Sequence, residues 1–127
     1  MAPAPDLAAD EPEIAALAER LRPVLAGVAR RGGTILYRDL ARDAGVPGPH
    51  TIHKTTLALE ALVRADHAAG HPLLAAVAVG KAGLPGPGFF QLLTALGRYD
   101  GADRGADAAA HHTAELARVH AAYRASG

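Results

Sequence analysis

Basic and hydroxyl-bearing side chains gather between residues 38 and 55, where their types and spacing suit contacts with nucleic acid. Arginine, lysine, histidine and threonine side chains donate hydrogen bonds to phosphate oxygens, and residues at the start of a recognition helix also reach base edges. We expect such contacts from a short helix, from the first turn of the helix after it and from the tip of a later loop. The candidate residues are Arg38, Arg42, His50, Thr51, His53, Lys54 and Lys81.

The charge of the chain limits how strong this binding can be. The whole chain has 13 basic and 13 acidic residues, and acidic side chains are interspersed in the same region, at Asp39, Asp43, Glu60 and Asp66. A net charge near zero excludes a strong, diffuse attraction to a polyanion, so any binding has to come from a local basic patch. We therefore expect the affinity to be modest.

No set of residues predicts catalysis. The chain has no cysteine, which excludes disulfides, thiolate nucleophiles and cysteine-ligated zinc, and its single serine, Ser126, lies near the C-terminal end. The seven histidines come without an HExxH motif, and Gly70 and Pro72 interrupt the helix between His67 and His71. We predict a non-enzymatic protein without a metal or other cofactor, with surface histidines that titrate near neutrality.

The N-terminal part of the chain predicts a tail followed by a long helix. Residues 1–9 have no hydrophobic periodicity, which predicts a disordered tail, and Asp10 is suited to cap the helix that follows. Apolar residues then recur at helical spacing until Gly32 and Gly33 end the helix. Pro23 lies inside this pattern, and we expect it to kink the helix or divide it into two.

The candidate contact residues are expected on a helix pair. Residues 34–37 predict a brief strand, residues 38–45 a short helix and residues 46–50 a rigid turn. A longer helix is expected over residues 51–69. Its inward side chains would be Ile52, Leu59, Leu62 and Val63, with His53, Glu60, Arg64 and His67 mostly on the outer side.

The second half of the chain predicts a strand, a turn and two helices. Residues 73–79 are apolar throughout and suit a buried strand, and residues 80–88 form a glycine- and proline-rich turn that could fold back as a hairpin or wing. Helices are expected over residues 89–99, with two phenylalanines capping the core, and over residues 108–125. The last helix has an apolar stripe that suits docking on the core or pairing with a second copy in a homodimer: Leu116, Val119 and Tyr123.

This order of elements predicts an α+β, mostly helical fold. Two helices joined by a tight turn and followed by a strand pair are typical of a winged helix-turn-helix, here with extra N- and C-terminal helices in a single domain over residues 10–127. An all-helical bundle is the competing fold, since residues 73–79 could continue a buried helix.

The acidic start lacks the basic and apolar parts of a secretory signal, and no apolar run is long enough to cross a bilayer. We expect a cytoplasmic protein without a membrane partner.

Residues 33–90 also carry a family resemblance. A tyrosine-leucine-alanine segment at 36–41, the long helix, the apolar segment at 72–79 and the glycine-rich 83–89 together resemble small bacterial winged-helix domains, including those N-terminal to HNH nucleases. The chain is more distantly similar to the DNA-binding domain of O6-alkylguanine alkyltransferases and alkyltransferase-like proteins. It departs from that family by lacking the reactive cysteine, and the family's helix arginine falls near His53 or Lys54.

Two functions follow from these observations. The first is a non-enzymatic domain that binds nucleic acid, in the first place double-stranded DNA, through the start of the 51–69 helix and Lys81. The alternative is a protein-interaction or accessory domain on the same frame that binds no nucleic acid. An exposed aromatic turn at residues 84–90, together with the absence of a basic patch, would favour this alternative.

Overall fold

The computed structural model describes residues 11–126, so the tail expected over residues 1–9 and the expected cap Asp10 lie outside the described residues. Its helices are α1 (Glu11–Arg30), α2 (Tyr37–Ala44), α3 (Thr51–Ala69), α4 (Pro87–Ala95) and α5 (Gly105–Ser126), with a short 3-10 helix, η2 (Leu74–Val77). Two short strands, β1 (Ile35–Leu36) and β2 (Ala78–Val79), pair in parallel. The fold is therefore α+β and mostly helical.

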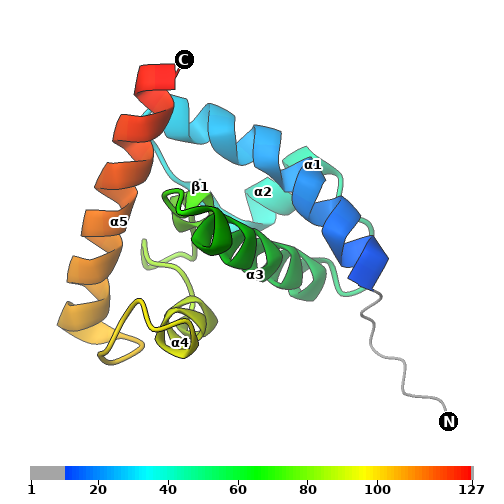
Figure 1. The fold of residues 1–127 in the computed structure, drawn as a ribbon. Coiled ribbons are helices and arrows are strands. Elements are labelled where there is room, and N and C mark those ends of the chain that lie inside the picture. Colours follow the sequence, from blue (N-terminus) through cyan, green and yellow to red (C-terminus); the bar gives the residue numbers. More distant parts are fainter. Residues whose placement is uncertain (1–10, 127) are drawn as a thin grey trace, which may run out of the picture.

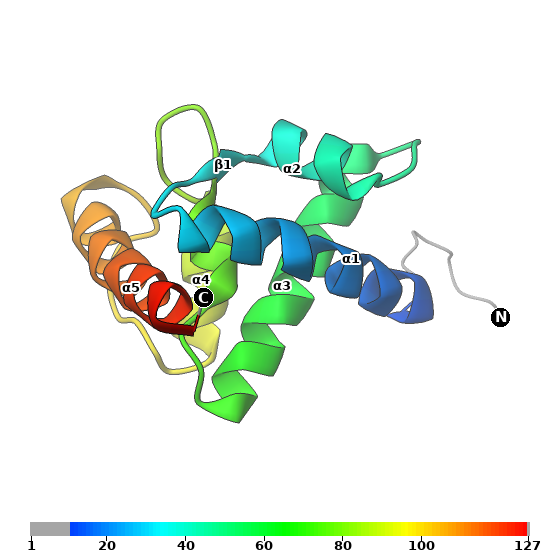
Figure 2. The same ribbon diagram turned by 90° about the horizontal axis from the view of Figure 1, so that it is seen from above.

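The helices enclose one hydrophobic core. α1 crosses over α3, α5 stands along one side, and α4 lies at the opposite end from α1 (Figures 1 and 2). α1 contributes a stripe at helical spacing that includes Leu17, Leu21 and Leu25, all nearly or fully buried. The apolar segment of η2 and β2 runs between α1, α3 and α5, and every residue from 73 to 79 is buried.

Glycines end the helices of the predicted helix pair. Gly45 and Gly70 follow α2 and α3 with φ angles of 70° and 74°, in the left-handed region that favours glycine. The amide of Val46 then bonds to the carbonyl of Ala41 at 2.9 Å, and the amide of His71 to that of Asp66 at 2.9 Å. These bonds satisfy carbonyls that the helix ends would otherwise leave without donors.

Most element boundaries agree with the sequence-based predictions. The α3 range is the predicted one, while α2, α4 and α5 begin one to three residues earlier than predicted, and α4 ends at Ala95 and not at residue 99 as predicted. Phe90 is buried and Phe89 packs partly buried against the core, as expected for the two phenylalanines. The parallel strands exclude an all-helical bundle.

Several predictions about local structure were wrong. Pro23 does not divide α1, so that part of the prediction was wrong, and the expected kink stays a prediction. The proline is exposed, and the carbonyl that loses its partner, on Glu19 one turn earlier, belongs to an exposed residue. Residues 73–79 form a 3-10 helix before only two strand residues. Ile52, predicted to point inward, is 47% exposed.

The glycine-rich segment after β2 is a loop without strand structure. It closes on itself through the amide of Gly80, which bonds to the carbonyl of Leu84 at 2.9 Å, and the amide of Gly83, which bonds to the carbonyl of Gly80 at 2.9 Å. The loop projects beside β1 (Figure 2). The expected strand hairpin is therefore absent from residues 80–86, although the segment does fold back.

None of the helices within residues 11–126 combines the length and the apolar character that crossing a membrane requires.

Candidate functional site

Two of the predicted basic residues lie at one surface hollow. The hollow has a volume of about 180 Å³, and its lining includes Arg38 from the first turn of α2, Ile52 from the first turn of α3 and Lys81 from the loop after β2. Ile52 is the exposed large hydrophobic residue of the described chain. Three segments that are distant in sequence thus present two cations around one apolar side chain.

The start of α3 lies at the same surface. His50 precedes the helix with a φ of 62°, and no side chain caps the first amide groups. The first turn holds no acidic residue, and His50 and His53 are exposed. The Thr51 hydroxyl lies 3.5 Å from the carbonyl of Pro47, the outer limit of a hydrogen bond. The positive end of the α3 dipole and its free amides therefore face solvent beside Ile52.

The arginines of α2 already contact carboxylates. Arg42 contacts Asp39 at 3.2 Å and Asp43 at 3.2 Å, and Arg38 lies 3.7 Å from Asp39. Both arginine side chains are about 70% exposed. Exposed pairs of this kind contribute little and exchange readily for another anion. Arg38 and Arg42 can therefore turn toward a phosphate, but the neighbouring carboxylates reduce the electrostatic free energy that such a contact gains.

Lys54 points away from the hollow. Its ammonium lies 3.6 Å from Oε2 of Glu13 on α1, and its side chain is only 20% exposed. Among the described residues, Lys81 has no ion pair. The structure therefore brings Arg38 and Lys81 together with the exposed start of α3, and it directs Lys54 toward α1.

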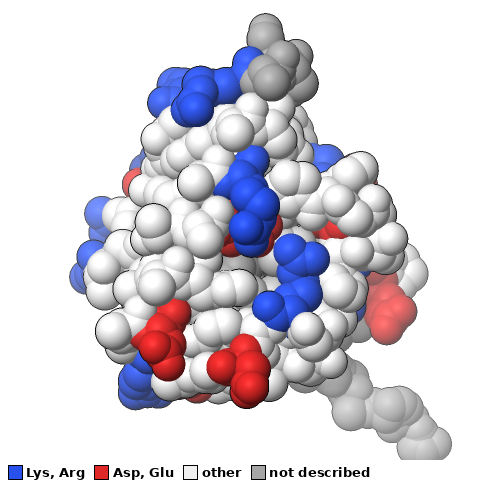
Figure 3. Space-filling view, turned by 60° about the vertical axis from the view of Figure 1, so that its left-hand side comes forward, with Lys and Arg blue, Asp and Glu red and all other residues white. Residues whose placement is uncertain are grey.

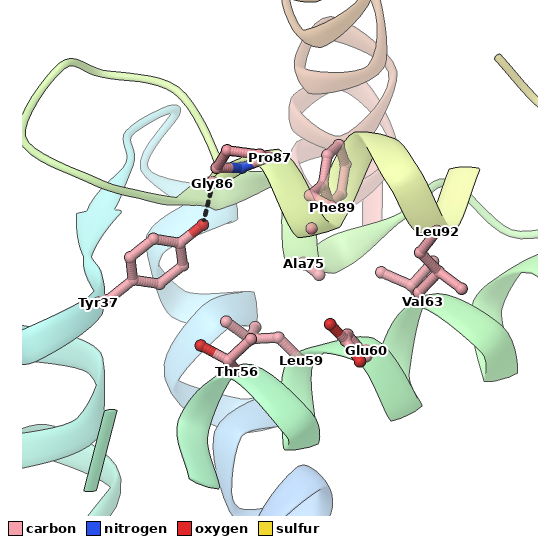
Figure 4. Close-up of a pocket in the computed structure, with 11 residues that line it drawn as sticks. Tyr37, Thr56, Leu59, Glu60, Val63, Ala75, Gly86, Pro87, Phe89 and Leu92 are labelled. Atoms are coloured by element: carbon pink, nitrogen blue, oxygen red, sulfur yellow. Dashed lines mark hydrogen bonds between the residues drawn. The ribbon is translucent and has the colours of Figure 1, made fainter. Parts of the chain in front are cut away.

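Tyr37 separates this hollow from a second, deeper cavity. The Tyr37 side chain lines both, and its hydroxyl oxygen accepts a hydrogen bond of 2.7 Å from the amide of Gly86 (Figure 4). Burial raises the pKa of the Tyr37 phenol, and the Gly86 amide acts in the opposite direction without cancelling it. The phenol is therefore protonated at neutral pH, and it fastens the end of the loop to the start of α2.

The second cavity has a volume of about 250 Å³ between α3 and α4. Apolar side chains make up most of its walls, among them Leu59, Val63, Phe89 and Leu92. Glu60 of α3 also lines it, and its carboxylate points into the space below Phe89 (Figure 4). The sequence pattern predicted Glu60 mostly on the outer side of the helix; its side chain is half-buried and lines this cavity together with residues of α4.

Two further carboxylates, those of Asp66 and Glu115, are buried, and no sequence pattern indicated their role. Oδ2 of Asp66 accepts a hydrogen bond of 3.2 Å from the amide of Leu74. Oε2 of Glu115 accepts one of 2.7 Å from the amide of Leu73. Arg22 contacts Asp66 at 3.2 Å, and Glu115 contacts both Arg118 and, at 3.5 Å, Arg98. These carboxylates cap the start of η2. Only the spacing of Glu115 four residues before the buried Val119 could have indicated its burial.

The histidines are not all on the surface. His112 is 4% exposed, with Nε2 2.8 Å from the carbonyl of Ala76, and Nε2 of half-buried His120 lies 2.9 Å from the carbonyl of Gly33. The prediction of surface histidines was therefore wrong for His112, which α5 carries into the core. No group of three or more His, Asp or Glu side chains in the described residues is arranged to hold a metal ion.

Charges of both signs also lie on other parts of the surface. On the face that brings the α5 side forward, basic side chains lie at the top, in the middle and at the left edge, and acidic ones lie along the lower edge, at the right and beneath the central basic group (Figure 3). Ion pairs such as those of Arg42 with Asp39 and Asp43 bring the two signs of charge side by side.

Comparisons with protein families, curated proteins and solved structures find no match to this chain.

Proposed function

We propose that this protein is a non-enzymatic nucleic-acid-binding domain on a winged-helix-like frame, and that it contacts the backbone of double-stranded DNA with modest affinity. The observation that carries the proposal is the shared hollow of Arg38, Ile52 and Lys81 beside the uncapped start of α3. A helix N-terminus with free amides and flanking cations suits a phosphate group. The resemblance to bacterial winged-helix and alkyltransferase-like domains agrees with this role.

The contact set of this proposal is small. Arg38 and Lys81 neutralise about two phosphates, which predicts a slope of about −1.8 for log K against log salt, and the first amides of α3 add a contact without net charge. Raising the salt from 50 to 200 mM then weakens binding roughly 12-fold. Asp39 and Asp43 beside the arginines reduce the attraction further, consistent with modest affinity.

Fluorescence anisotropy with a labelled duplex, titrated at several salt concentrations, tests the proposal. Lys81→Ala removes one phosphate contact and should make the salt slope shallower by about one unit. Lys54→Ala is the matched control, because it removes the same charge from a side chain that contacts Glu13. Its slope should equal that of the wild type.

Two outcomes would contradict the proposal. One is the absence of binding to duplex, single-stranded DNA and RNA at low salt. The other is an equal loss of slope in the Lys81 and Lys54 variants, which would mean that net charge and not this surface attracts the nucleic acid.

The alternative is a protein-interaction domain, which an exposed aromatic turn at residues 84–90 would favour. Phe90 is 1% exposed and Pro85 is buried, whereas Phe89 is half-buried and Pro87 is exposed, so the turn is only partly exposed. We keep nucleic-acid binding as the proposed function because the Arg38 and Lys81 hollow supports it.

A further inference from the structure

The cavity between α3 and α4 is lined by a carboxylate that makes no contact stabilising the described fold. Glu60 lines the cavity, and it has no hydrogen bond or ion pair with any described residue. The other two acidic residues at or near the core on this side of the molecule, Asp66 and Glu115, each contact an arginine and a backbone amide. Glu60 is therefore exceptional among the carboxylates that the core partly covers.

The surroundings of Glu60 favour a positive charge. The residues that line the cavity include no lysine, arginine or histidine. Arg64, one helical turn further along α3, lines a different groove between α1 and α3. The negative charge of Glu60 is not balanced by any side chain that lines the cavity, so a ligand that brings a positive charge is attracted to it.

Aromatic rings complete the site. Tyr37 and Phe89 both line the cavity, and Figure 4 shows Phe89 above the Glu60 carboxylate with Tyr37 at the other side. The faces of aromatic rings attract ammonium and guanidinium groups, and such rings together with a carboxylate are a recurrent means of binding organic cations. The hydroxyl of Thr56 also lines the cavity and offers a further polar contact.

We infer that this cavity binds a small organic cation, an ammonium or amidinium group on an apolar body, with its charged end at Glu60. The apolar body packs against Leu59, Val63 and Leu92. A volume of about 250 Å³ lies just below the usual range of drug-sized sites, so the ligand is about as large as one aromatic ring with a short cationic arm. The inference does not depend on nucleic-acid binding, because Tyr37 separates this cavity from the Arg38 and Lys81 hollow.

Binding of benzamidinium and phenethylammonium, followed by NMR shifts of backbone amides, tests the inference. For ligands of this size we expect dissociation constants on the order of 1 mM. The shifts should map to residues around the cavity, such as Thr56, Glu60 and Gly88. The neutral analogue benzamide, which has almost the same shape, should bind at least about tenfold more weakly because it lacks the charge.

Two variants and a control distinguish the contribution of the Glu60 charge to binding from that of the cavity volume. Glu60→Gln should weaken benzamidinium binding about tenfold and leave benzamide binding unchanged. Gly88→Leu should abolish the binding of both, because a Cβ on Gly88 would lie 3.6 Å from Oε2 of Glu60 and the added side chain would extend into the cavity. Glu19→Gln, at an exposed position on α1, removes the same charge elsewhere and should bind like the wild type.

Each contrary result overturns the inference. It is wrong if no cation shifts the cavity amides of the folded wild-type protein at 10 mM ligand. It is also wrong if benzamide binds as tightly as benzamidinium, or if Glu60→Gln and Glu19→Gln weaken binding equally. Circular dichroism of each variant verifies that the fold is retained before binding is compared.

Discussion

Glu115 is a fully buried acid whose charge is matched by its neighbours. Burial alone raises the pKa of this carboxyl, but the Leu73 amide and the guanidinium groups of Arg118 and Arg98 outweigh burial and leave the pKa below its ordinary value. The carboxylate therefore stabilises the folded protein in its charged form. Because the same carboxylate caps the start of η2, it connects the charge state of one residue to the position of the central segment.

The lowered pKa of Glu115 predicts acid sensitivity. A carboxyl with a lower pKa in the folded state stabilises the protein above its ordinary pKa of about 4.3, and this contribution is lost as the pH falls through the lower folded value. Glu115→Gln should lower the free energy of unfolding by about 1–2 kcal/mol at pH 7, since a neutral amide accepts the Leu73 hydrogen bond less strongly and leaves the partly exposed Arg98 and Arg118 without their anion. Its deficit relative to the wild type should shrink as the pH falls below about 4.

Urea unfolding at pH 7, 5, 4 and 3 measures this dependence. Glu19→Gln, which changes an exposed glutamate, should lie close to the wild-type curve at every pH. An equal difference between Glu115→Gln and the wild type at all four pH values would show that the Glu115 charge has no stabilising role.

The strands β1 and β2 and the loop after β2 are short, and contacts with residues distant in the sequence keep them in position. β1 and β2 have two residues each, and the loop after β2 has no strand of its own to keep it in place. The hydrogen bond from the Gly86 amide to the Tyr37 hydroxyl provides that anchor across 49 residues of sequence. The positions of Lys81 and of the cavity wall at Gly86 therefore depend on one phenol.

Tyr37→Phe should loosen the loop without unfolding the protein. The change leaves the Gly86 amide without its acceptor, a loss of about 1 kcal/mol, and amide exchange should become faster within residues 80–86. Hydrogen exchange followed by mass spectrometry or NMR measures this effect.

Tyr99→Phe is the control for the loop. The Tyr99 hydroxyl donates to the carbonyl of Ala102 at 2.7 Å, in the connection between α4 and α5, so its removal should leave exchange at residues 80–86 unchanged. Equal exchange in the wild type and Tyr37→Phe would contradict the anchoring role of Tyr37.

At the scale of the whole molecule, the segment from 73 to 79 holds the helices together. α1, α3 and α5 all pack against η2, and Leu73, Leu74 and Val77 have no exposed surface. A cavity at such a point is shared by several helices and cannot be filled by movement of one of them. Changes here should therefore affect the cooperative unfolding of the whole described domain.

Leu74→Ala should lower the free energy of unfolding by about 2–5 kcal/mol. Leu57→Ala, the same change at a partly exposed position on α3, should cost less than half as much, because solvent already reaches that side chain. Urea titrations monitored by circular dichroism compare the two variants. Equal costs would mean that residues 73–79 have no special place in the core.

Local sequence patterns were sufficient for the helices. The α3 range, the ends of α2 and α3 at Gly45 and Gly70, and the mostly helical α+β class could all be predicted, because helical periodicity and glycine at a helix end act over a few residues. The basic residues near α3 could be selected by type in the same way. Their surroundings could not be predicted.

The contacts between residues that are distant in the sequence were decided only by the tertiary structure. The sequence by itself determined that residues 73–79 are buried. The parallel pairing of β2 with β1, and the contacts of the Asp66 and Glu115 carboxylates with the start of the 3-10 helix, were decided by the tertiary structure. Likewise, residues of α4 line the same cavity as Glu60, and α1 brings Glu13 to Lys54. The physical reason is that periodicity specifies which face of a helix is apolar, whereas the packing of all helices around one core determines which polar side chains meet.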